Sequence, residues 1–190
     1  RAKRPGFFMF GEAFDHEAKN IAPFTLPENG AVSVLDFPLK AAMVKVFGRE
    51  QADYAEIAPA LFLKDGPYRN VYELMTFYDN HDMARLDADD EGFIDAHNLL
   101  FTARGIPVVY YGSESGFMRG TVEHAGNRNY FGVEGIAAAR QSPIRTALME
   151  VAEARDDDLV VAAGIAQQAR PEHLRAAAVA RGEDGRERTV

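Results

Sequence analysis

Short apolar runs, each followed by a polar residue or a glycine, recur along most of the chain. They lie at Phe7–Phe10 (FFMF), Ala31–Phe37 (AVSVLDF), Val71–Tyr78 (VYELMTFY) and Ile106–Tyr111 (IPVVYY). Continuous apolar runs of this length are typical of strands that are buried on both faces of a sheet. The pattern therefore predicts four buried strands.

Apolar residues at helical spacing follow three of these runs. They lie at Leu39, Met43, Val46 and Phe47, at Phe93, Ala96, Leu100 and Phe101, and at Ile144, Leu148 and Val151. Gly48 and Gly105 are suitable stops for the first two helices, and Ser142-Pro143 is a suitable start for the third. A further helical stretch is predicted at Ala52–Leu63. Alternation of strands and helices on this scale predicts parallel βαβ units.

The pattern changes after about Asp158. Leu159–Ala163 and Leu174–Ala180 are predicted to be strands, although the second could equally form a short helix. The turn sequence GEDG then leads to a third strand at Arg188–Val190. We therefore predict two domains: an α/β domain over residues 1–155 and the start of an antiparallel, all-β domain over residues 156–190.

Composition narrows the class of protein. A chain of 190 residues with 47% hydrophobic content can bury a substantial core. A net charge of −8 argues against a nucleic-acid partner, which usually requires a basic face. Cysteine is absent, which excludes disulfides and thiolate metal sites. No apolar run approaches the length that would span a membrane, so no membrane partner is predicted.

The two ends of the sequence suggest a longer protein. The chain begins at Arg1 and stops at Thr189–Val190, inside a predicted strand. Four parallel strands without further partners would leave two apolar edge strands exposed, whereas a closed barrel has no edges. We therefore expect the isolated chain to be poorly stable, or to associate, unless additional sequence completes it.

The first candidate chemistry follows the first predicted strand, in GEAFD at Gly11–Asp15. Catalytic side chains of a (β/α) barrel lie at the carboxyl ends of its strands. The nearby phenylalanines Phe7, Phe8, Phe10 and Phe14 are expected to desolvate Glu12 partly, as a general acid requires. The alternative is that Glu12 is an ordinary solvated surface group.

The second candidate follows the third predicted strand, in YDNHD at Tyr78–Asp82. Its amide, imidazole and carboxylates can bond several hydroxyl groups, which is how proteins orient sugars. Together with Glu12, Asp82 suggests cleavage of glycosidic bonds by paired carboxyl groups. Two alternatives are a metal site and an acidic loop in which Asp79 and Asp82 favour the positive end of a helix dipole.

Four segments in order resemble the α-amylase superfamily, glycoside hydrolase family 13. FFMFGEAFD resembles its strand-five motif, and ELMTFYDNHD resembles its strand-seven F-x-x-N-H-D motif. AVSVLDFPL and GIPVVYYGSE are similar to strands six and eight, while YGSESGFMRG and GNRNYFG are similar to the stretch that follows. The resemblance covers residues 7–154. It implies that the chain holds the last four strands of a (β/α)8 TIM barrel.

The resemblance also implies roles for individual residues. Glu12 would be the general acid/base and Asp82 the transition-state stabiliser. The implied substrate-binding residues are Asn80, His81, Phe14 and Arg85. Phe14 would stack on a sugar ring, and Arg85 would shape the sugar site. The family's D-x-x-x-N-H and G-x-R-x-D motifs are absent, and the second of these would supply the nucleophile.

The resulting expectation is an enzyme of α-amylase type that acts on starch or maltodextrins, as a hydrolase or a transglycosylase. This chain alone would be inactive, because it needs an N-terminal half-barrel that supplies the nucleophile. No cofactor is expected within the chain, although the complete protein could bind Ca²⁺. A periplasmic or extracellular location is expected from the family. The alternative is a non-catalytic, amylase-like sugar-binding or scaffold protein.

Overall fold

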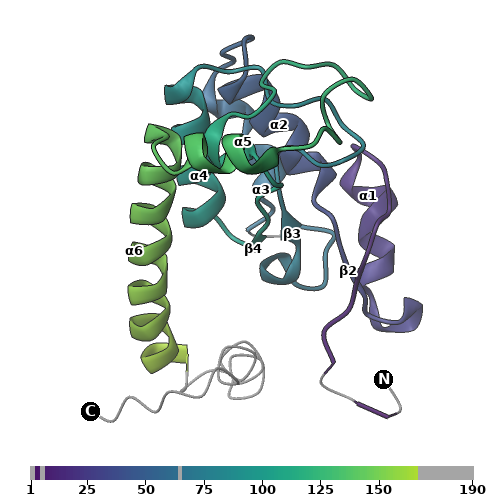
Figure 1. Cartoon of the computed structure of the whole chain (residues 1–190). Coiled ribbons are helices and arrows are strands. Elements are labelled where there is room, and N and C mark those ends of the chain that lie inside the picture. Colours follow the sequence, from purple (N-terminus) through teal and green to yellow (C-terminus); the bar gives the residue numbers. More distant parts are fainter. Residues whose placement is uncertain (1–2, 5–6, 64–65, 167–190) are drawn as a thin grey trace. The chain divides into compact units, whose positions relative to one another are not determined.

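The structure is a computed structural model that describes residues 3–4, 7–63 and 66–166, with side chains described up to residue 155 (Figure 1). The chain divides into two compact units, one of which is Met9–Ala152. All the strands among the described residues, and all the candidate site residues, lie in this unit.

Four short parallel strands form the centre of this unit. They are β1 (Phe10–Gly11), β2 (Ser33–Val34), β3 (Met75–Thr76) and β4 (Ile106–Pro107). β1 pairs with β2 and β3 pairs with β4, both in parallel, and a parallel bridge between Leu35 and Met75 joins the two pairs. The strands therefore lie side by side in sequence order. The four predicted strand positions and their parallel direction are confirmed.

The regular strands are shorter than the apolar runs that predicted them. In Val71–Tyr78 the first three residues form a 3₁₀ turn, Val71–Glu73, because the Asn70 side chain accepts a hydrogen bond from the Tyr72 N–H at 3.1 Å. Asparagine often caps a turn in this way and so competes with strand formation. Backbone hydrogen bonds outside the assigned strands extend the pairing. One example is the 2.8 Å hydrogen bond from the Val108 N–H to the Thr76 carbonyl.

Two helices connect successive strands. The helix α2 (Phe37–Phe47) links β2 to β3, and α4 (Asp90–Thr102) links β3 to β4. Asp36 caps α2 by accepting from the Leu39 N–H at 3.3 Å, and Asp89 caps α4 by accepting from the Gly92 N–H at 2.8 Å. Both helices agree with the predicted apolar spacing.

The other elements are short, except for the last helix. They are α1 (Ala18–Ile21), α3 (Ala58–Leu61), α5 (Gly132–Ala139), α6 (Pro143–Ala166) and the 3₁₀ turns η1 (Ala22–Thr25), η2 (Pro27–Asn29), η3 (Tyr54–Glu56), η4 (Val71–Glu73) and η5 (Ser113–Ser115). The helical stretch predicted at Ala52–Leu63 is therefore confined to η3 and α3. Phe62 ends it by adopting a left-handed conformation, with φ of 49°.

The strand predicted at Leu159–Ala163 is wrong, because α6 continues through it to Ala166. Alanine, leucine, glutamate and arginine dominate the sequence before it, and their helix propensity outweighs the two valines at Val160-Val161. Leu174–Ala180 and Arg188–Val190 lie outside the described residues. The domain division at residues 155 and 156 thus stays a prediction. None of the described helices is long and apolar enough to cross a membrane.

The buried core has two parts. The larger lies between α2 and α4 and comprises Leu39, Ala42, Met43, Val46, Phe47, Ile57, Ala60, Tyr78, Leu86, Phe93, Ala96, Leu100 and Ile144. The smaller lies beside β2 and the start of β3 and comprises Ile21, Ala22, Val34, Tyr68, Val71 and Leu74. Packing in the larger core holds α2 and α4 against each other. Because each of these helices connects two strands, the same packing also positions the strands.

A buried ion pair joins elements that are far apart in the sequence. Asp36, which caps α2, pairs with Arg104, which follows α4. Arg104 also donates to the carbonyls of Ala60 at 2.7 Å and Leu61 at 2.8 Å, in α3. Gly105 follows with φ of 97°, and a Cβ atom there would lie 2.9 Å from the Leu74 carbonyl oxygen. This junction therefore sets where β4 begins.

Candidate active site

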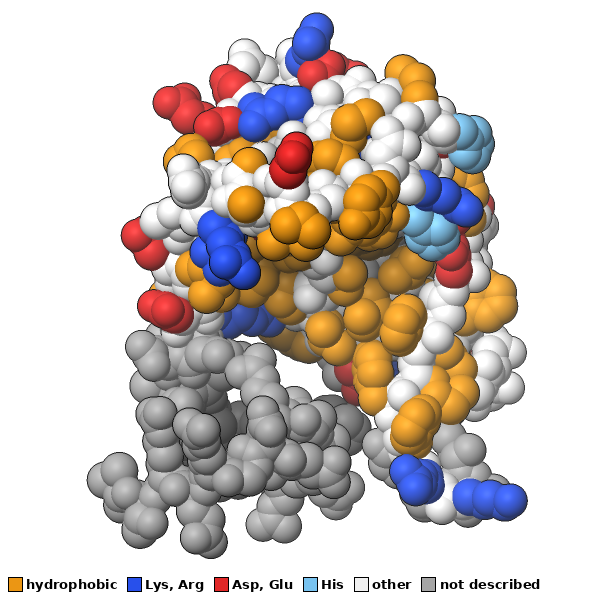
Figure 2. Space-filling model, viewed as in Figure 1, with side chains coloured by type: hydrophobic (Ala, Val, Ile, Leu, Met, Phe, Trp, Pro, Cys, Tyr) orange, Lys and Arg blue, Asp and Glu red, His pale blue; other side chains and the backbone are white. Residues whose placement is uncertain are grey.

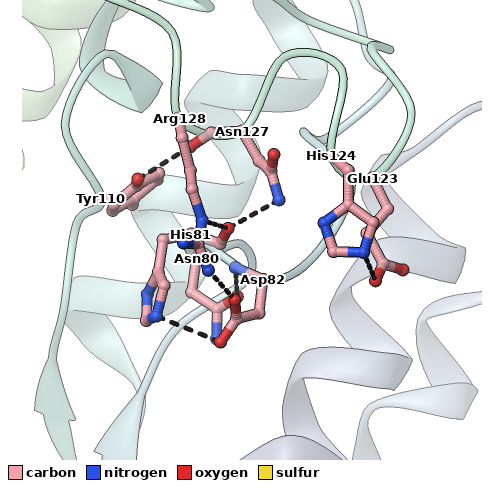
Figure 3. Close-up of polar contacts among 8 residues, drawn as sticks. All are labelled: Asn80, His81, Asp82, Tyr110, Glu123, His124, Asn127 and Arg128. Carbon is pink, nitrogen blue, oxygen red and sulfur yellow. Dashed lines mark hydrogen bonds and ion pairs between the residues drawn. The ribbon is translucent and has the colours of Figure 1, made fainter.

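The loop that follows β3 carries three of the predicted site residues next to one another (Figure 3). The Asn80 side chain accepts a hydrogen bond from the Asp82 N–H at 2.9 Å, which makes the turn tight. His81 Nε2 lies 3.1 Å from Asp82 Oδ2. His81 is exposed, whereas Asn80 and Asp82 are half-buried. The loop thus presents an amide, an imidazole and a carboxylate at the carboxyl end of β3.

A second loop, after β4, holds the first in place. Asn127 Nδ2 donates to the His81 carbonyl at 2.6 Å, and Arg128 Nε donates to the same carbonyl at 3.1 Å. Arg128 also forms an ion pair with Asp82. The Tyr110 hydroxyl donates to the Asn127 carbonyl at 2.8 Å (Figure 3). Asp82 is therefore oriented by a cation on one oxygen and an imidazole on the other.

Asp79 lies beneath this loop and is buried, with 2% of its surface exposed. Its carboxylate oxygens accept from the Ser113 hydroxyl at 2.8 and 3.0 Å. Burial raises the pKa of Asp79 from 3.8 to about 6, while Ser113 and the charges of Arg85 and Lys40 oppose that rise. The alternative that Asp79 lies at the start of a helix and favours its dipole is wrong, because α4 begins only at Asp90. Asp79 instead joins the loop after β3 to the 3₁₀ turn after β4.

Arg85 is also buried, at 3% exposure. Its guanidinium donates to the Tyr111 carbonyl at 2.7 Å and to the Gly126 carbonyl at 3.3 Å. It also lies over the rings of Tyr110 at 4.6 Å and Tyr111 at 4.9 Å. These contacts bury the Arg85 guanidinium among groups of the chain itself, and its expected role in substrate binding stays a prediction. It shapes the site by holding together the two loops that carry it.

Glu12 and Phe14 follow β1, at the same edge of the sheet as the loop after β3. Glu12 is exposed, and Phe14 is 62% exposed with its ring edge-on to Phe37 at 4.9 Å. The expected desolvation of Glu12 is wrong for the described residues, since Phe10 is also 55% exposed. The reason is that β1 is the first strand of the described sheet, so its outer side has no neighbouring strand. No hydrogen bond or ion pair among the described residues joins Glu12 to Asp82.

Sequence reasoning missed three residues of this arrangement: Tyr110, Asn127 and Arg128. From the sequence, Ile106–Tyr111 predicts only a buried strand, and GNRNYFG offers only a resemblance. A usable signal was present, because consecutive parallel strands place the loops after β3 and β4 at the same sheet edge. An arginine in the second loop is a natural partner for an aspartate in the first.

The described residues do not favour a metal site. Among them, no three histidine, aspartate or glutamate side chains come together as a ligand set. Asp79 bonds to Ser113, and Arg128 places a positive charge on Asp82 where a cation would have to bind. The hypothesis of a metal site at Asp79–Asp82 is therefore not supported by a ligand set among the described residues.

Comparison with known proteins identifies the family. A family profile described as the alpha amylase catalytic domain matches residues 1–170. The chain belongs to the alpha-amylase catalytic-domain family. This membership, together with the order of the four parallel strands, is consistent with part of a (β/α)8 barrel.

Individual relatives agree with this assignment. The chain is 35% identical over 131 residues to an alpha-amylase of Streptomyces lividans, covering 60% of this chain and 14% of that protein. It is 32% identical over 111 residues to a cyclomaltodextrin glucanotransferase of Bacillus licheniformis, covering 56% of this chain and 16% of that protein. The crystal structure of CldA, also a cyclomaltodextrin glucanotransferase, matches with a TM-score of 0.67 and 27% identity, over 82% of this chain and 32% of that one. The chain thus spans about a third or less of the length of these relatives.

Proposed function

We propose that the protein to which this chain belongs is a retaining enzyme that acts on α-glucosidic bonds of starch or maltodextrins, as a hydrolase or a transglycosylase. Family membership supports this class of reaction. The observation that carries the proposal is the position of Glu12 and Asp82. Each follows a parallel strand at the same edge of one sheet, which is where (β/α) barrels carry their catalytic residues.

The proposed reaction begins with Glu12, which donates a proton to the glycosidic oxygen. Asp82, oriented by Arg128 and His81, stabilises the positive charge that develops on the sugar ring. Asn80 and His81 bond sugar hydroxyls, and Phe14 offers an exposed ring for stacking. Glu12 then acts as a base toward water in hydrolysis, or toward a sugar hydroxyl in transglycosylation.

The nucleophile of this scheme comes from outside the chain. The family's G-x-R-x-D motif is absent from the sequence, so we propose that another part of the complete protein supplies the carboxylate. The isolated chain is then inactive. We assign no step of this scheme to a metal ion. The compartment that we propose, periplasmic or extracellular, rests on the family resemblance alone.

The test replaces Glu12 with glutamine and Asp82 with asparagine in the complete protein. We expect each change to lower kcat on maltoheptaose by at least about 100-fold, because each removes a charge or proton needed only in the transition state. Glu28→Gln is the matched control, since Glu28 is exposed and precedes β2 at the opposite end of the sheet. Release of reducing ends would be measured. Undiminished turnover in either site variant would refute its assigned role.

A second candidate, which the polar groups of Asn80, His81 and Asp82 also support, is a sugar-binding protein without catalysis. That function predicts that the complete protein binds maltoheptaose but releases no reducing ends and transfers no glucosyl units. The same assay on the unmodified protein, with binding measured by calorimetry, distinguishes the two candidates.

A further inference from the structure

Asp79 and Arg85 are buried charged groups that take no part in the proposed catalytic steps. In Figure 2, acidic and basic side chains are scattered over the visible face of the molecule, where water solvates them. Asp79 is only 2% exposed and Arg85 only 3%. Charged side chains are rarely buried to this extent, because removing them from water costs free energy that their partners must offset. What these partners hold in place therefore indicates the role of Asp79.

The Asp79 carboxylate interacts with three parts of the chain. Ser113, in the 3₁₀ turn η5 after β4, donates its hydroxyl to the carboxylate, 2.8 Å from Oδ1 and 3.0 Å from Oδ2. The Leu86 N–H, in the loop after β3, donates to the same carboxylate. The positive charge of Lys40, on α2, acts on it as well. One carboxylate thus links the loops after β3 and β4 with α2.

From Asp79 the contacts continue to the loop after β4. Arg85 Nη1 donates to the Ser113 hydroxyl oxygen at 3.3 Å, so Ser113 lies between the guanidinium and the carboxylate. Arg85 Nε donates to the Gly126 carbonyl at 3.3 Å. An ionised Asp79 can only accept, which fixes the direction of the bonds from Arg85 through Ser113 to Asp79. A protonated Asp79 can itself donate to Ser113, so it removes this constraint.

Gly126 directly precedes the two residues that orient Asp82. Asn127 donates to the His81 carbonyl at 2.6 Å, and Arg128 forms an ion pair with Asp82. These contacts close a ring that returns to the loop after β3. A shift of one member of the ring therefore changes the direction from which Arg128 holds the Asp82 carboxylate.

We propose that ionised Asp79 is a positioning residue for Asp82. It acts through Ser113 and Arg85, which fix the loop that carries Arg128. This inference rests on the proposed function, in which Asp82 stabilises the transition state. Because its carboxylate is buried, Asp79 contacts neither the substrate nor the reacting atoms. A displacement of about 1 Å at a reacting group can lower a rate about 100-fold, so an indirect role of this kind is measurable.

The charge of Asp79 changes within a pH range in which turnover can be measured. Burial raises the pKa of Asp79 to about 6. The hydrogen bonds from Ser113 and Leu86 oppose this rise in pKa. The positive charges of Arg85 and Lys40 oppose it too. Asp79 is therefore ionised above about pH 6, and its positioning effect is lost as the pH falls through this value.

The neighbouring titratable groups respond to burial in other directions. Burial raises the pKa of Tyr78 well above its usual value, and it lowers the pKa of His97, which bonds to the Tyr78 hydroxyl, to about 4. Both groups are therefore neutral at pH 6, where Asp79 titrates. Burial also lowers the pKa of Lys40. The acidic groups that act on these neighbours are Glu114 and Glu123.

The test measures kcat on maltoheptaose between pH 4.5 and pH 7.5 in the complete protein and in its Asp79→Asn variant. Asparagine is similar in shape to protonated aspartic acid and can still accept a hydrogen bond from Ser113, so this variant mimics the protonated form. The ratio of the two kcat values isolates Asp79, since every other titratable group is present in both proteins. The matched control is Asp95→Asn, which removes an exposed carboxylate on α4.

We expect the unmodified protein to exceed Asp79→Asn in kcat by about tenfold at pH 7.5. The ratio should fall to about one at pH 4.5, with a midpoint near pH 6, because the group at position 79 is then neutral in both proteins. A ratio that does not change with pH would show a merely structural role and overturn the inference. The same pH dependence in Asp95→Asn would also overturn it.

Ser113→Ala is a second variant, which keeps the carboxyl group of Asp79 but removes the hydroxyl between it and Arg85. We expect kcat at pH 7.5 to fall severalfold. The Ser113 hydrogen bond favours ionised Asp79, so its loss should also move the midpoint to higher pH. The midpoint is obtained from the ratio of kcat in Ser113→Ala to kcat in the double variant with Asp79→Asn. A midpoint that stays in place or moves to lower pH would contradict the inference.

These measurements separate the two proposals. If the unmodified protein turns over maltoheptaose and the ratio is independent of pH, the positioning role fails and the catalytic proposal stands. If the unmodified protein neither cleaves nor transfers α-glucan, the catalytic proposal fails, and the Kd for maltoheptaose becomes the measured quantity. The positioning role then stands only if Asp79→Asn raises this Kd at least about threefold at pH 7.5 and leaves it unchanged at pH 4.5.

Discussion

Asp79 shows how burial and hydrogen bonding oppose each other at one residue of the site. Its carboxylate is removed from water, directly before Asn80, His81 and Asp82 in the chain. The Ser113 hydroxyl and the charge of Arg85 favour the ionised form, yet burial outweighs them and raises the pKa to about 6. The ionised form therefore costs free energy in the folded chain at neutral pH.

The sign of the resulting pH dependence follows from the direction of the shift. Because the folded chain holds the Asp79 proton to a higher pH than the unfolded chain, the contribution of Asp79 to stability is largest below about pH 4 and is lost as pH rises through about 6. We expect the free energy of unfolding of the unmodified protein, minus that of Asp79→Asn, to fall by about 2 kcal/mol between pH 4 and pH 7. Urea unfolding of the complete proteins at a series of pH values would measure it. A difference that grew with pH would contradict the assignment.

At this scale the sequence predicts which residues follow the strands but not what surrounds them. Asn80, His81 and Asp82 were located because they directly follow an apolar run. The burial of Arg85 and the pairing of Arg128 with Asp82 depend on a loop that is far away in the sequence. No local pattern shows which side of such a loop faces inward.

Among the elements, helices were predicted more fully than strands. The bounds of α2 and α4 agree with the apolar spacing and the capping residues, since both signals are local. The strands reach only two residues each, and at Val71–Tyr78 the cause is the Asn70 cap, which turns the first three residues into η4. At Leu159–Ala163 the two valines suggested a strand, but the helix that begins at Pro143 continues through them.

The Asp36–Arg104 pair offers a test at the level of elements, because it joins α2, α3 and the end of α4. Arg104→Met would leave the Asp36 carboxylate buried and unpaired, so we expect a loss of about 3–5 kcal/mol in the free energy of unfolding. The double variant Asp36→Leu with Arg104→Met removes both charges and should lose less than Arg104→Met alone.

The matched control for this pair is Arg119→Met, since Arg119 forms an exposed ion pair with Asp90 at 2.7 Å. Arg119→Met should lower the free energy of unfolding by less than about 1 kcal/mol. Denaturant unfolding of the complete proteins gives all three values. A double variant that is less stable than Arg104→Met would show that the pair itself, and not the unpaired charge, dominates.

For the molecule as a whole, parallel pairing and the order of strands could be predicted, because alternation of strands and helices allows few topologies. The same topology leaves β1 and β4 at the two ends of the described sheet. Side chains around β1 are exposed although they are apolar: Met9 at 38%, Phe10 at 55%, Phe14 at 62% and Phe24 at 50%. A protein surface of this kind favours association.

We therefore expect residues 1–190, prepared alone, to form concentration-dependent assemblies. Sedimentation velocity over a range of concentrations would detect them, and Phe24→Ser should reduce them more than Tyr54→Ser does. Tyr54 is similarly exposed, at 61%, but lies in η3 near α2 and α4, away from β1. A monodisperse monomer that unfolds cooperatively would contradict the expectation.

Gly105 has a consequence for how this segment tolerates variation. Its φ of 97° disfavours every other residue type, and an added Cβ would meet the Thr76 hydroxyl and the Leu74 carbonyl, on β3 and directly before it. At Gly11 the nearest atom to an added Cβ is 3.9 Å away, and φ is not in the left-handed region. If every position of the chain were randomised and folded variants were selected, position 105 would retain almost only glycine, whereas position 11 would accept alanine. The start of β4 is thus a point at which the chain has almost no freedom to diverge.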